Sequence, residues 1–393
     1  MERPATYHSE PAGAEAAAGY QAFKRVKFFG SLDGLRAISI LGVIWYHTVP
    51  GSHDSLLGQG NKGVTLFFVI SGFLIVTLLL RAKEAAGTFS LPRFWGRRML
   101  RIFPVYYAVL AAYCLLVWKL EKDGVARETF FNNVPAFATF TANWFVNLDN
   151  ARVIFYFAWS LVAEEQFYMV WPFIERFARG RWPLAAALGT LVVTQIAGWL
   201  AGDLARTQLG LRIVTSVPAA ILLGVMLAHV LNDPVSYRQA WRWAGRRGSA
   251  LAAAILSLLV LNYAPRWGAG GELLIAVTLA GLVATCVVRE DNDFASLLRW
   301  RPIAWIGTVS YGMYLMHMIA VNLMRKAGAA AGIEMSPHAD FVAGSVAALI
   351  LATVSYLTYE KFFLVLKDRW FGGEKGRQTD AKVVVSGLAG VRS

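Results

Sequence analysis

An arginine and a histidine lie eleven residues apart in one apolar stretch, with Arg36 near its start and His47 near its end. An α-helix returns to nearly the same face after eleven residues and rises by about 16 Å over that length. One apolar helix would therefore carry a fixed cation and a titratable imidazole on a single face. Ionisable groups inside a membrane helix cost roughly 2.5–3.5 kcal/mol on insertion scales and are usually functional. This spacing favours a reaction that joins the two sides of a membrane.

His47 allows two interpretations. Its imidazole changes charge near neutral pH, so it could act as a general base toward an acceptor hydroxyl. It could instead be a histidine satisfied at the membrane interface, because Trp45 and Tyr46 precede it as in an aromatic belt. The presence of Asp33 and Arg36 on the same stretch favours the catalytic interpretation.

Arg98 and Arg101 lie three residues apart in FWGRRMLRIFPVYY, so on a helix they share one face. A guanidinium fork suits phosphate oxygens, and coenzyme A carries several phosphates. The pair could therefore clamp an anionic donor. Positive-inside anchoring at the membrane surface explains the same two residues equally well.

Two adjacent carboxylates, Glu164 and Glu165, occur in the apolar stretch WSLVAEEQFYMVWPF. Carboxylates are costly inside a membrane, which makes Glu164 a candidate catalytic residue. Neighbouring helical positions diverge by about 100°, so we expect that both carboxylates do not face one site. Ser160, Glu164 and Tyr168 share a face instead. The alternative is a structural carboxylate that pairs with Arg36 or another cation.

A further polar stripe lies in IGTVSYGMYLMHMIA, where Ser310, Tyr314 and His317 share one helix face. A hydrogen-bonded structural stripe is one interpretation. The other is that His317 rivals His47 as the catalytic base. His229 is a third histidine in an apolar stretch, but it has no polar neighbours in the sequence.

Ser71 lies in the middle of the apolar stretch GVTLFFVISGFLI. The Gly-x-Ser-x-Gly pattern of a nucleophile elbow is absent there. We interpret Ser71 and Gly72 as a place of close helix packing, with a covalent acyl-serine as the alternative.

The composition is that of a polytopic membrane protein. Of the 393 residues, 56% are hydrophobic and 16% are charged, whereas soluble proteins have about 25% charged residues. Cys114 and Cys286 both fall in apolar segments, so neither a disulfide framework nor a metal site is expected. Residues 1–27 lack the hydrophobic core of a signal peptide.

We expect an all-α fold, a polytopic membrane helix bundle with about ten transmembrane helices and both termini cytoplasmic. Residues 1–30 would form a disordered cytoplasmic segment, residues 31–366 the membrane domain and residues 367–393 a cytoplasmic tail. Residues 133–146 could form a re-entrant or interfacial piece. Ten hydrophobic segments are long enough, or nearly so, to cross a core of about 30 Å. They are residues 35–50, 63–80, 102–118, 153–175, 184–201, 213–231, 250–263, 272–288, 303–323 and 341–360.

The distribution of positive charge predicts the orientation. With the N-terminus in the cytoplasm, most Lys and Arg residues fall in cytoplasmic segments, as the positive-inside rule requires. Arg36 would then lie toward the cytoplasm and His47 toward the outside, with residues 119–152 as the longest outer loop. The net charge of +13 would face anionic lipid headgroups and anionic cytosolic ligands. No nucleic acid is expected as a partner, because no soluble domain is present to bind it.

In these residues the chain resembles the membrane acyltransferase-3 family, the multi-span O-acyltransferases of bacterial envelope glycans. The resemblance covers about residues 31–361. The chain departs from the family after Glu360, where a proline often follows two residues later and this sequence has Phe362. The resemblance rests on five motifs in order, which are SLDGLRAISILGVIWYH, GVTLFFVISGFLI, RRMLRIFPVYY, WSLVAEEQFYMVWP and SYGMYLMH.

The resemblance implies a multi-pass enzyme of the bacterial cytoplasmic (inner) membrane, in a stand-alone form without an SGNH domain. It would move an acyl group, usually acetyl, from cytoplasmic acyl-coenzyme A (acetyl-CoA) to a hydroxyl of a sugar or glycan outside. The acceptor could be lipid-linked. His47 carries over as the catalytic base and Glu164 as a site residue. Arg36, Arg98 and Arg101 carry over to donor binding.

We assign Trp159, Tyr168, Tyr314 and His317 to substrate binding, and Arg36 to catalysis as well as to the donor. Arg36 or a nearby tyrosine could stabilise the oxyanion of a tetrahedral intermediate. Two other classes stay open. Buried charges at several depths also suit a proton-coupled transporter of a glycan or small molecule. A non-catalytic glycan-binding scaffold is the third possibility, and the oligomeric state is open.

Overall fold

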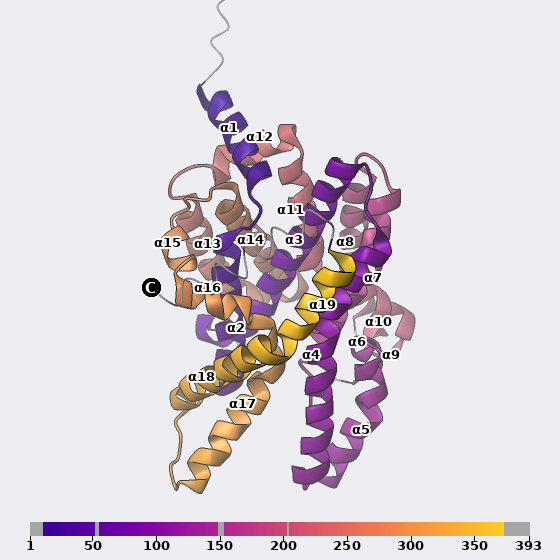
Figure 1. Ribbon diagram of the computed structural model, residues 1–393, viewed down its shortest axis with the longest axis vertical. Coiled ribbons are helices and arrows are strands. Elements are labelled where there is room, and N and C mark those ends of the chain that lie inside the picture. Colours follow the sequence, from indigo (N-terminus) through magenta and orange to yellow (C-terminus); the bar gives the residue numbers. More distant parts are fainter. Residues whose placement is uncertain (1–10, 52–54, 148–152, 203, 373–393) are drawn as a thin grey trace, which may run out of the picture.

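The computed structural model describes residues 11–51, 55–147, 153–202 and 204–372. This described part consists of helices joined by turns and short loops, without a β-strand (Figure 1). The first half contains α1 (Pro11–Arg25), α2 (Gly30–Thr48), the 3₁₀ helix η1 (Leu56–Lys62), α3 (Gly63–Ala86), α4 (Leu91–Leu120), α5 (Gly124–Ala138), α6 (Ala142–Phe145), α7 (Ala158–Phe177) and α8 (Trp182–Ala201). Next come α9 (Leu204–Thr207), α10 (Leu209–Thr215), α11 (Ala219–Asn232), α12 (Pro234–Ala244), α13 (Ser249–Tyr263), the 3₁₀ helix η2 (Ala264–Trp267) and α14 (Gly268–Val288). The last part contains α15 (Ala295–Leu298), α16 (Arg301–Thr308), α17 (Ser310–Ala330), α18 (Pro337–Ser355), the π-helix η3 (Tyr356–Glu360) and α19 (Lys361–Phe371).

Among the described residues, six helical stretches are long and apolar enough to cross a membrane, and up to eight are if each of two bent helix pairs forms one span. The bent pairs are α1 with α2, at 72°, and α16 with α17, at 78°. Of the segments predicted from the sequence, 213–231 is broken between α10 and α11, and 303–323 is broken between α16 and α17. Helix α7 begins at Ala158 rather than at residue 153, and the number of ten spans stays a prediction. One stretch, Ser249–Val288, contains two of the predicted segments, because α13 and α14 follow each other with only η2 between them.

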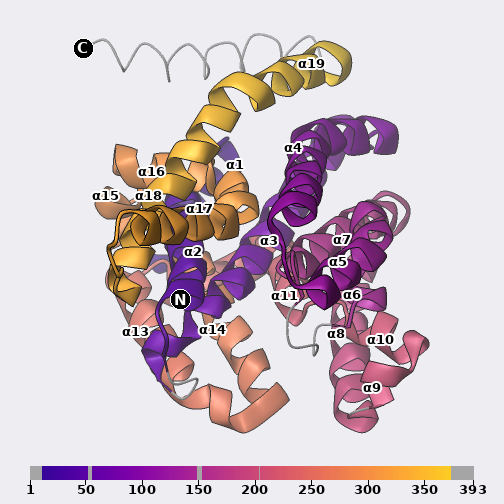
Figure 2. The ribbon, with the colours of Figure 1, turned by 90° about the horizontal axis from the view of Figure 1, so that it is seen from below.

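Two hydrophobic cores meet along α2 and α7. One core contains the first half of α2, represented by Leu35, with much of α3, α11 and α14. The other contains the second half of α2, represented by Ile44, with α4, α5, α17 and α18. Helix α7 divides in the same way, since Leu161 belongs to the second core and Phe167 to the first. In Figure 2, α17 and α18 of the second core lie on one side of α3, and α4 and α5 lie on the other. Residues on α2 and α7 are therefore held from both sides.

Small residues bring α3 and α11 into close contact. A Cβ built on Gly72 would lie 2.1 Å from the carbonyl oxygen of Ile221, and one on Gly224 would lie 2.3 Å from that of Val69. No larger residue fits such a backbone approach without a shift of one helix. The prediction of close packing at Gly72 is confirmed.

The N-terminal expectation needs a correction. Residues 1–30 were expected to be disordered, yet Pro11–Arg25 form α1. An arginine of α3 holds this segment: the guanidinium of Arg81 lies 5.3 Å from the ring centroids of both Phe23 and Phe29, and it donates hydrogen bonds to the carbonyls of Phe23 and Val26. Burial of Phe23, which is 1% exposed, supplies apolar stabilisation that the Ala-rich sequence did not suggest.

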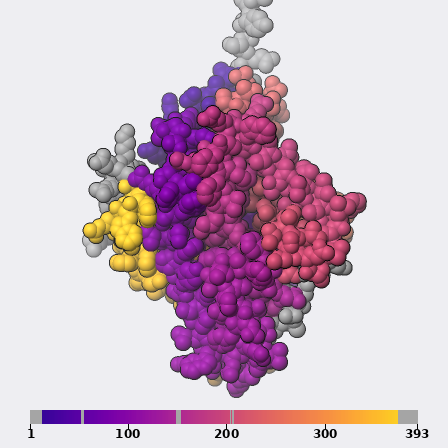
Figure 3. All heavy atoms as spheres, turned by 90° about the vertical axis from the view of Figure 1, so that its right-hand side faces the viewer, coloured from indigo at the N-terminus to yellow at the C-terminus, as the bar shows by residue number. Residues whose placement is uncertain are grey.

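The expected long outer loop is largely helical. Helix α5 packs along α4, where the hydroxyls of Tyr106 and Tyr107 donate to the carbonyls of Phe137 (2.8 Å) and Ala138 (2.9 Å). In space-filling view, the α4–α5 pair forms the lower end of one face of the molecule (Figure 3). The segment at 133–146 falls on the end of α5 and on α6. Residues 148–152 of the loop and 373–393 of the predicted tail lie outside the described residues.

Candidate active site

Helix α2 carries Arg36 and His47 in the arrangement that the sequence predicts. It runs without interruption from Gly30 to Thr48, so the two residues are separated by about 16 Å along its axis. Both residues are partly exposed. Tight packing fixes the first turn of α2, because a Cβ on Gly307 of α16 would lie 1.9 Å from the carbonyl oxygen of Asp33.

His47 lies in a polar group that we term the histidine cluster, made of His47, Tyr156, Ser160, Tyr314 and His317. The Tyr156 hydroxyl is 2.9 Å from Nδ1 of His47 and 3.5 Å from Nε2. On another side, the rings of His47 and His317 stack with centroids 5.2 Å apart. The cluster thus combines α2, α17, the start of α7 and the turn before α7.

His317 has a defined tautomer in its neutral form. Its Nδ1 lies 2.6 Å from the backbone carbonyl oxygen of Tyr314. A carbonyl only accepts, so Nδ1 carries the hydrogen and Nε2 keeps a lone pair. Within the described ranges Nε2 has no hydrogen-bond partner, and the residue is 0% exposed. The ring of His317 therefore supports His47 and presents no surface of its own.

Hydroxyl groups tie α17 to the beginning of α7. Tyr314 donates to the carbonyl of Phe157 at 2.8 Å, and its oxygen lies 2.6 Å from Oγ of Ser160. Both residues are buried. His317 lies on α17 just after Tyr314, and Tyr156 lies in the turn just before Phe157. These two bonds therefore fix the position of His317 relative to Tyr156.

A second polar group surrounds Glu164, which lies on α7 six residues after the first residue of that helix. Oε1 of Glu164 accepts hydrogen bonds from Ser71 Oγ at 2.5 Å, from Arg98 Nη2 at 3.3 Å and from the Tyr168 hydroxyl. The Arg98 guanidinium lies 3.4 Å from the Tyr168 ring centroid, a cation–π contact. We term the arginine cluster the set of Asp33, Arg36, Ser71, Arg98, Arg101, Glu164, Glu165 and Tyr168.

The expectation that Glu164 and Glu165 do not face one site is wrong. Glu165 Oε1 lies 3.5 Å from Arg98 Nε, while Glu164 contacts Nη2 of the same group. Although adjacent side chains on a helix point in different directions, one guanidinium is wide enough for two of its nitrogens to contact both carboxylates. Arg98 thus pairs with both carboxylates, and Arg36 pairs with Asp33 at 3.1 Å instead. The structural alternative for Glu164 is seen, and its catalytic role stays a prediction.

Arg101 differs from its two neighbours. Among the residues that the structure describes, its guanidinium makes no hydrogen bond or ion pair, and the residue is exposed. It lies within electrostatic range of Arg36 and Arg98. Glu360, in the π-helix of the last predicted span, is also in range, but its carboxylate accepts from Ser355 at 3.1 Å. The N–H groups of Arg101 are therefore available to an anion, and those of Arg36 other than Nη1 are as well.

Residues that were predicted to share one catalytic site lie in two different clusters. Glu164, predicted as catalytic beside His47, lies in the arginine cluster, and Tyr168 is a buried donor to it. Trp159 packs edge-on against Phe68, with centroids 6.2 Å apart. Sequence reasoning missed Tyr156, because it lies in a turn without periodicity and outside any motif.

His229 has a polar partner in the fold that its sequence neighbours do not show. Its Nε2 lies 2.9 Å from Oε1 of Glu175, which also accepts from Trp171 Nε1 at 2.9 Å. The pair is buried and joins α11 to α7. It is separate from both clusters.

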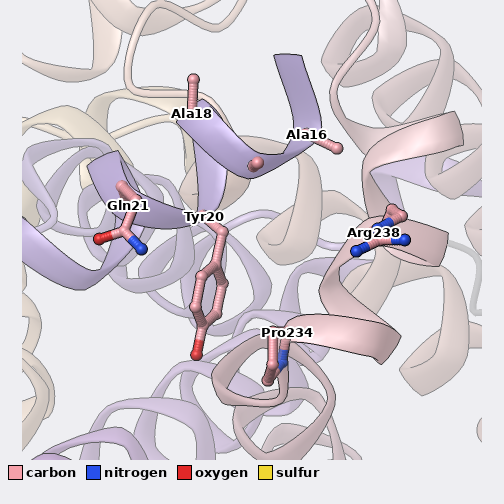
Figure 4. A pocket seen from close by; sticks show the side chains of 7 residues that line it. Ala16, Ala18, Tyr20, Gln21, Pro234 and Arg238 are labelled. Atoms are coloured by element: carbon pink, nitrogen blue, oxygen red, sulfur yellow. The ribbon is translucent and has the colours of Figure 1, made fainter. Parts of the chain in front are cut away.

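One surface pocket lies away from both clusters. It measures about 430 Å³ and sits between α1 and α12, where Tyr20 and Arg238 line it (Figure 4). None of the candidate site residues reaches it, so we do not connect it with the chemistry. No group of three or more His, Cys, Asp or Glu residues that could hold a metal occurs among the described residues.

These features define a class: an all-helical, multi-pass membrane protein with two internal polar clusters at different depths of the bundle. The chain belongs to the acyltransferase-3 family, since the model of its acyltransferase domain matches residues 29–357. The motif resemblance noted from the sequence is thereby confirmed.

Named relatives come from bacteria. The chain is 30% identical over 330 residues to "Putative peptidoglycan O-acetyltransferase YrhL" of Bacillus subtilis, covering 77% of this chain and 50% of that protein. It is 28% identical over 323 residues to "Peptidoglycan O-acetyltransferase OatA" of Listeria monocytogenes, covering 76% and 50%. The chain thus spans about half the length of these relatives. No solved structure matches it.

Proposed function

We propose that this protein is an integral-membrane O-acyltransferase that moves an acyl group, in the simplest case acetyl, from acyl-coenzyme A to a glycan hydroxyl. The observation that carries this proposal is that helix α2 has a different polar group near each of its ends. A solvent-accessible imidazole within a hydroxyl-rich cluster lies at one end, and an available guanidinium, Arg101, lies beside Arg36 near the other. Family membership and the names of the relatives support the reaction class, with peptidoglycan as one acceptor to test.

Arg101 and Arg36 would bind the phosphates of the donor. A guanidinium binds phosphate oxygens in bidentate fashion, and Arg101 would not have to leave a carboxylate to do so. Arg98 would act indirectly, because it holds Glu164 and Glu165. The pantetheine arm is long and flexible, and it would extend along α2 over the distance of about 16 Å between the clusters.

His47 would act as the general base at the other end. It would take the proton of the acceptor hydroxyl as this oxygen attacks the thioester carbon, and later return it to the departing thiolate. His317 would keep the His47 ring in place by stacking. Trp159, Tyr168, Tyr314 and His317 remain the proposed substrate-binding residues. Of these, His317 stacks on His47, and Tyr314 lies beside His317.

The proposed topology has about ten membrane-crossing helices, with both termini in the cytoplasm of a bacterial inner membrane. The membrane domain would comprise residues 31–366 and the tail residues 367–393. The distribution of Lys and Arg along the sequence supports this orientation. It would place the arginine cluster toward the cytoplasmic pool of acyl-coenzyme A and His47 toward the outside.

A coenzyme A release assay tests the proposal. Purified protein in detergent is mixed with acetyl-coenzyme A and peptidoglycan fragments, and free thiol and acetylated fragments are measured together. We expect equimolar thiol and acetyl ester, dependent on the acceptor and lost in His47→Ala. Transport of unmodified glycan without thiol release would indicate a transporter, and binding alone would indicate a scaffold.

A further inference from the structure

An acyl transfer to a hydroxyl needs a hydrogen-bond donor at the oxyanion, next to the base. The base and the oxyanion donor act on atoms of the same tetrahedral centre, so they must lie within a few ångströms of each other. Arg36 is about 16 Å from His47 along the axis of α2, farther than an arginine side chain reaches. The sequence-based candidate Arg36 therefore cannot serve an oxyanion formed at His47.

Tyr156 offers a hydroxyl at the required place. Its oxygen is 2.9 Å from one nitrogen of the His47 ring and 3.5 Å from the other. His47 is its only hydrogen-bond partner in the described part of the chain. The other hydroxyls of the cluster are engaged, since Tyr314 donates to the Phe157 carbonyl and Ser160 lies 2.6 Å from Tyr314. The Tyr156 hydroxyl can therefore turn from His47 to a substrate oxygen without leaving another buried group unpaired.

The turn that carries Tyr156 is firmly held. Phe155, just before it, has φ of 67°, a left-handed conformation that is uncommon for a bulky residue. Phe155 and Phe157 on either side are each 2% exposed. Tyr113 of α4 packs against both rings, with centroids 4.8 and 6.0 Å away. Strained backbone of this kind persists where the surroundings determine it, and it is common at active sites.

We propose that Tyr156 is a catalytic residue, whose O–H donates the hydrogen bond that stabilises the oxyanion during acyl transfer at His47. This inference rests on the proposed O-acyltransferase function. Arg36 would then act only in binding the acyl-coenzyme A donor at the arginine cluster. Tyr156 would be presented to the reacting atoms by the turn, and His47 by α2.

The transfer proceeds by addition to the thioester carbon and elimination of the thiolate. The acceptor oxygen forms a bond to the thioester carbon, and its proton moves to a ring nitrogen of His47. The carbonyl oxygen becomes an oxyanion that accepts the hydrogen bond from Tyr156. The carbon–sulfur bond then breaks, and the coenzyme A thiolate takes the proton from the His47 imidazolium. The products are an ester and a free thiol, and Tyr156 keeps its own proton throughout.

The Tyr156→Phe variant tests the assignment. We expect kcat to fall by about 10²–10³-fold, as for loss of one oxyanion donor, with KM for donor and acceptor nearly unchanged. The matched control is Tyr113→Phe, because Tyr113 packs against the same turn and its buried hydroxyl has no partner in the described residues. That variant should keep the wild-type kcat. A drop in kcat of the same size in both variants would show that Tyr156 acts through packing, and would overturn the proposal.

A second variant covers the case in which Tyr156→Phe does not fold. A ring-fluorinated tyrosine at position 156 keeps the shape and the O–H but is more acidic. Its activity should decline at lower pH than in the wild type, since the phenolate cannot donate. Equal kcat in wild type and Tyr156→Phe, or an unshifted alkaline limb with fluorotyrosine, would contradict the inference. Because wild-type activity is measured alongside, failure of the O-acyltransferase function itself would appear separately, as absence of thiol release in the wild type.

Discussion

The rings of His47 and His317 lie stacked, with centroids 5.2 Å apart and planes 25° from parallel. Two histidines that the sequence offers as rival bases are thus direct neighbours, from α2 and α17. They differ in access. His47 is partly exposed, whereas His317 is 0% exposed and donates through Nδ1 to a backbone carbonyl. This difference in access favours His47 as the proposed base and His317 as a supporting ring.

A pair of variants separates these roles. His47→Gln should lower kcat by about 10²–10⁴-fold, the usual contribution of a general base, and leave the affinity for acetyl-coenzyme A unchanged. His317→Phe keeps a ring in the stack and should cost less than about tenfold in kcat. Steady-state kinetics of thiol release measures both. Loss of activity in His317→Phe together with retention in His47→Gln would exchange the roles.

Arg101 should contribute directly to donor affinity. Removing a charge-assisted hydrogen bond costs about 1.5–3 kcal/mol, so Arg101→Ala should weaken binding of acetyl-coenzyme A by roughly 10–100-fold. Isothermal titration calorimetry in detergent measures this. The matched control is Arg93→Ala on the same helix, since Arg93 donates to the Phe371 carbonyl and lies outside the cluster. If Arg101→Ala binds the donor like the wild type, Arg101 is only a membrane anchor.

Arg98 should matter for stability rather than for the donor alone. Its removal leaves Glu164 and Glu165 without their cation inside the bundle, which typically costs about 3–5 kcal/mol. Arg98→Ala should therefore lower the unfolding temperature in detergent. Adding Glu164→Gln and Glu165→Gln should restore much of the loss, because neutral amides need no counter-charge. An Arg98→Ala protein with unchanged unfolding temperature and weakened donor binding would show that Arg98 contacts the phosphates instead.

The close approach of α3 and α11 gives a packing prediction. Gly72→Ala would place Cβ at 2.1 Å from the Ile221 carbonyl, so we expect a destabilisation of about 1–3 kcal/mol. Gly281→Ala in α14 meets no atom within 4 Å and should be neutral or stabilising by up to about 1 kcal/mol. Thermal unfolding of both variants in the same detergent checks the difference. Equal unfolding temperatures would mean that α3 and α11 are not in this contact.

The helical fold and the face shared by Arg36 and His47 could be predicted from the sequence, because both follow from local periodicity and apolar length. Such features depend on residues within one or two turns of each other. Close packing at Gly72 could also be predicted, because small residues in apolar helices favour helix contact, but its partner helix α11 could not. The helix at Pro11–Arg25 could not be predicted, since it is fixed by Arg81, which lies far along the chain.

The composition of each cluster was less predictable. Glu165 joins Arg98 because two long side chains bridge a divergence that backbone geometry alone would forbid. His229 meets Glu175 across 54 positions of sequence. Tyr156 reaches His47 from a turn whose left-handed residue, Phe155, has no sequence signature. Contacts of this kind depend on tertiary packing, which a single sequence does not show.

In the proposed mechanism, donor and acceptor act at opposite ends of the line from Arg36 to His47. The most direct test uses the protein in sealed vesicles with a known orientation, with radiolabelled acetyl-coenzyme A on one side and peptidoglycan fragments on the other. We expect acetylated fragments only when the donor is on the side of Arg36, with free coenzyme A released on that same side. Transfer that requires both substrates on one side, or that continues undiminished in His47→Gln, would contradict it.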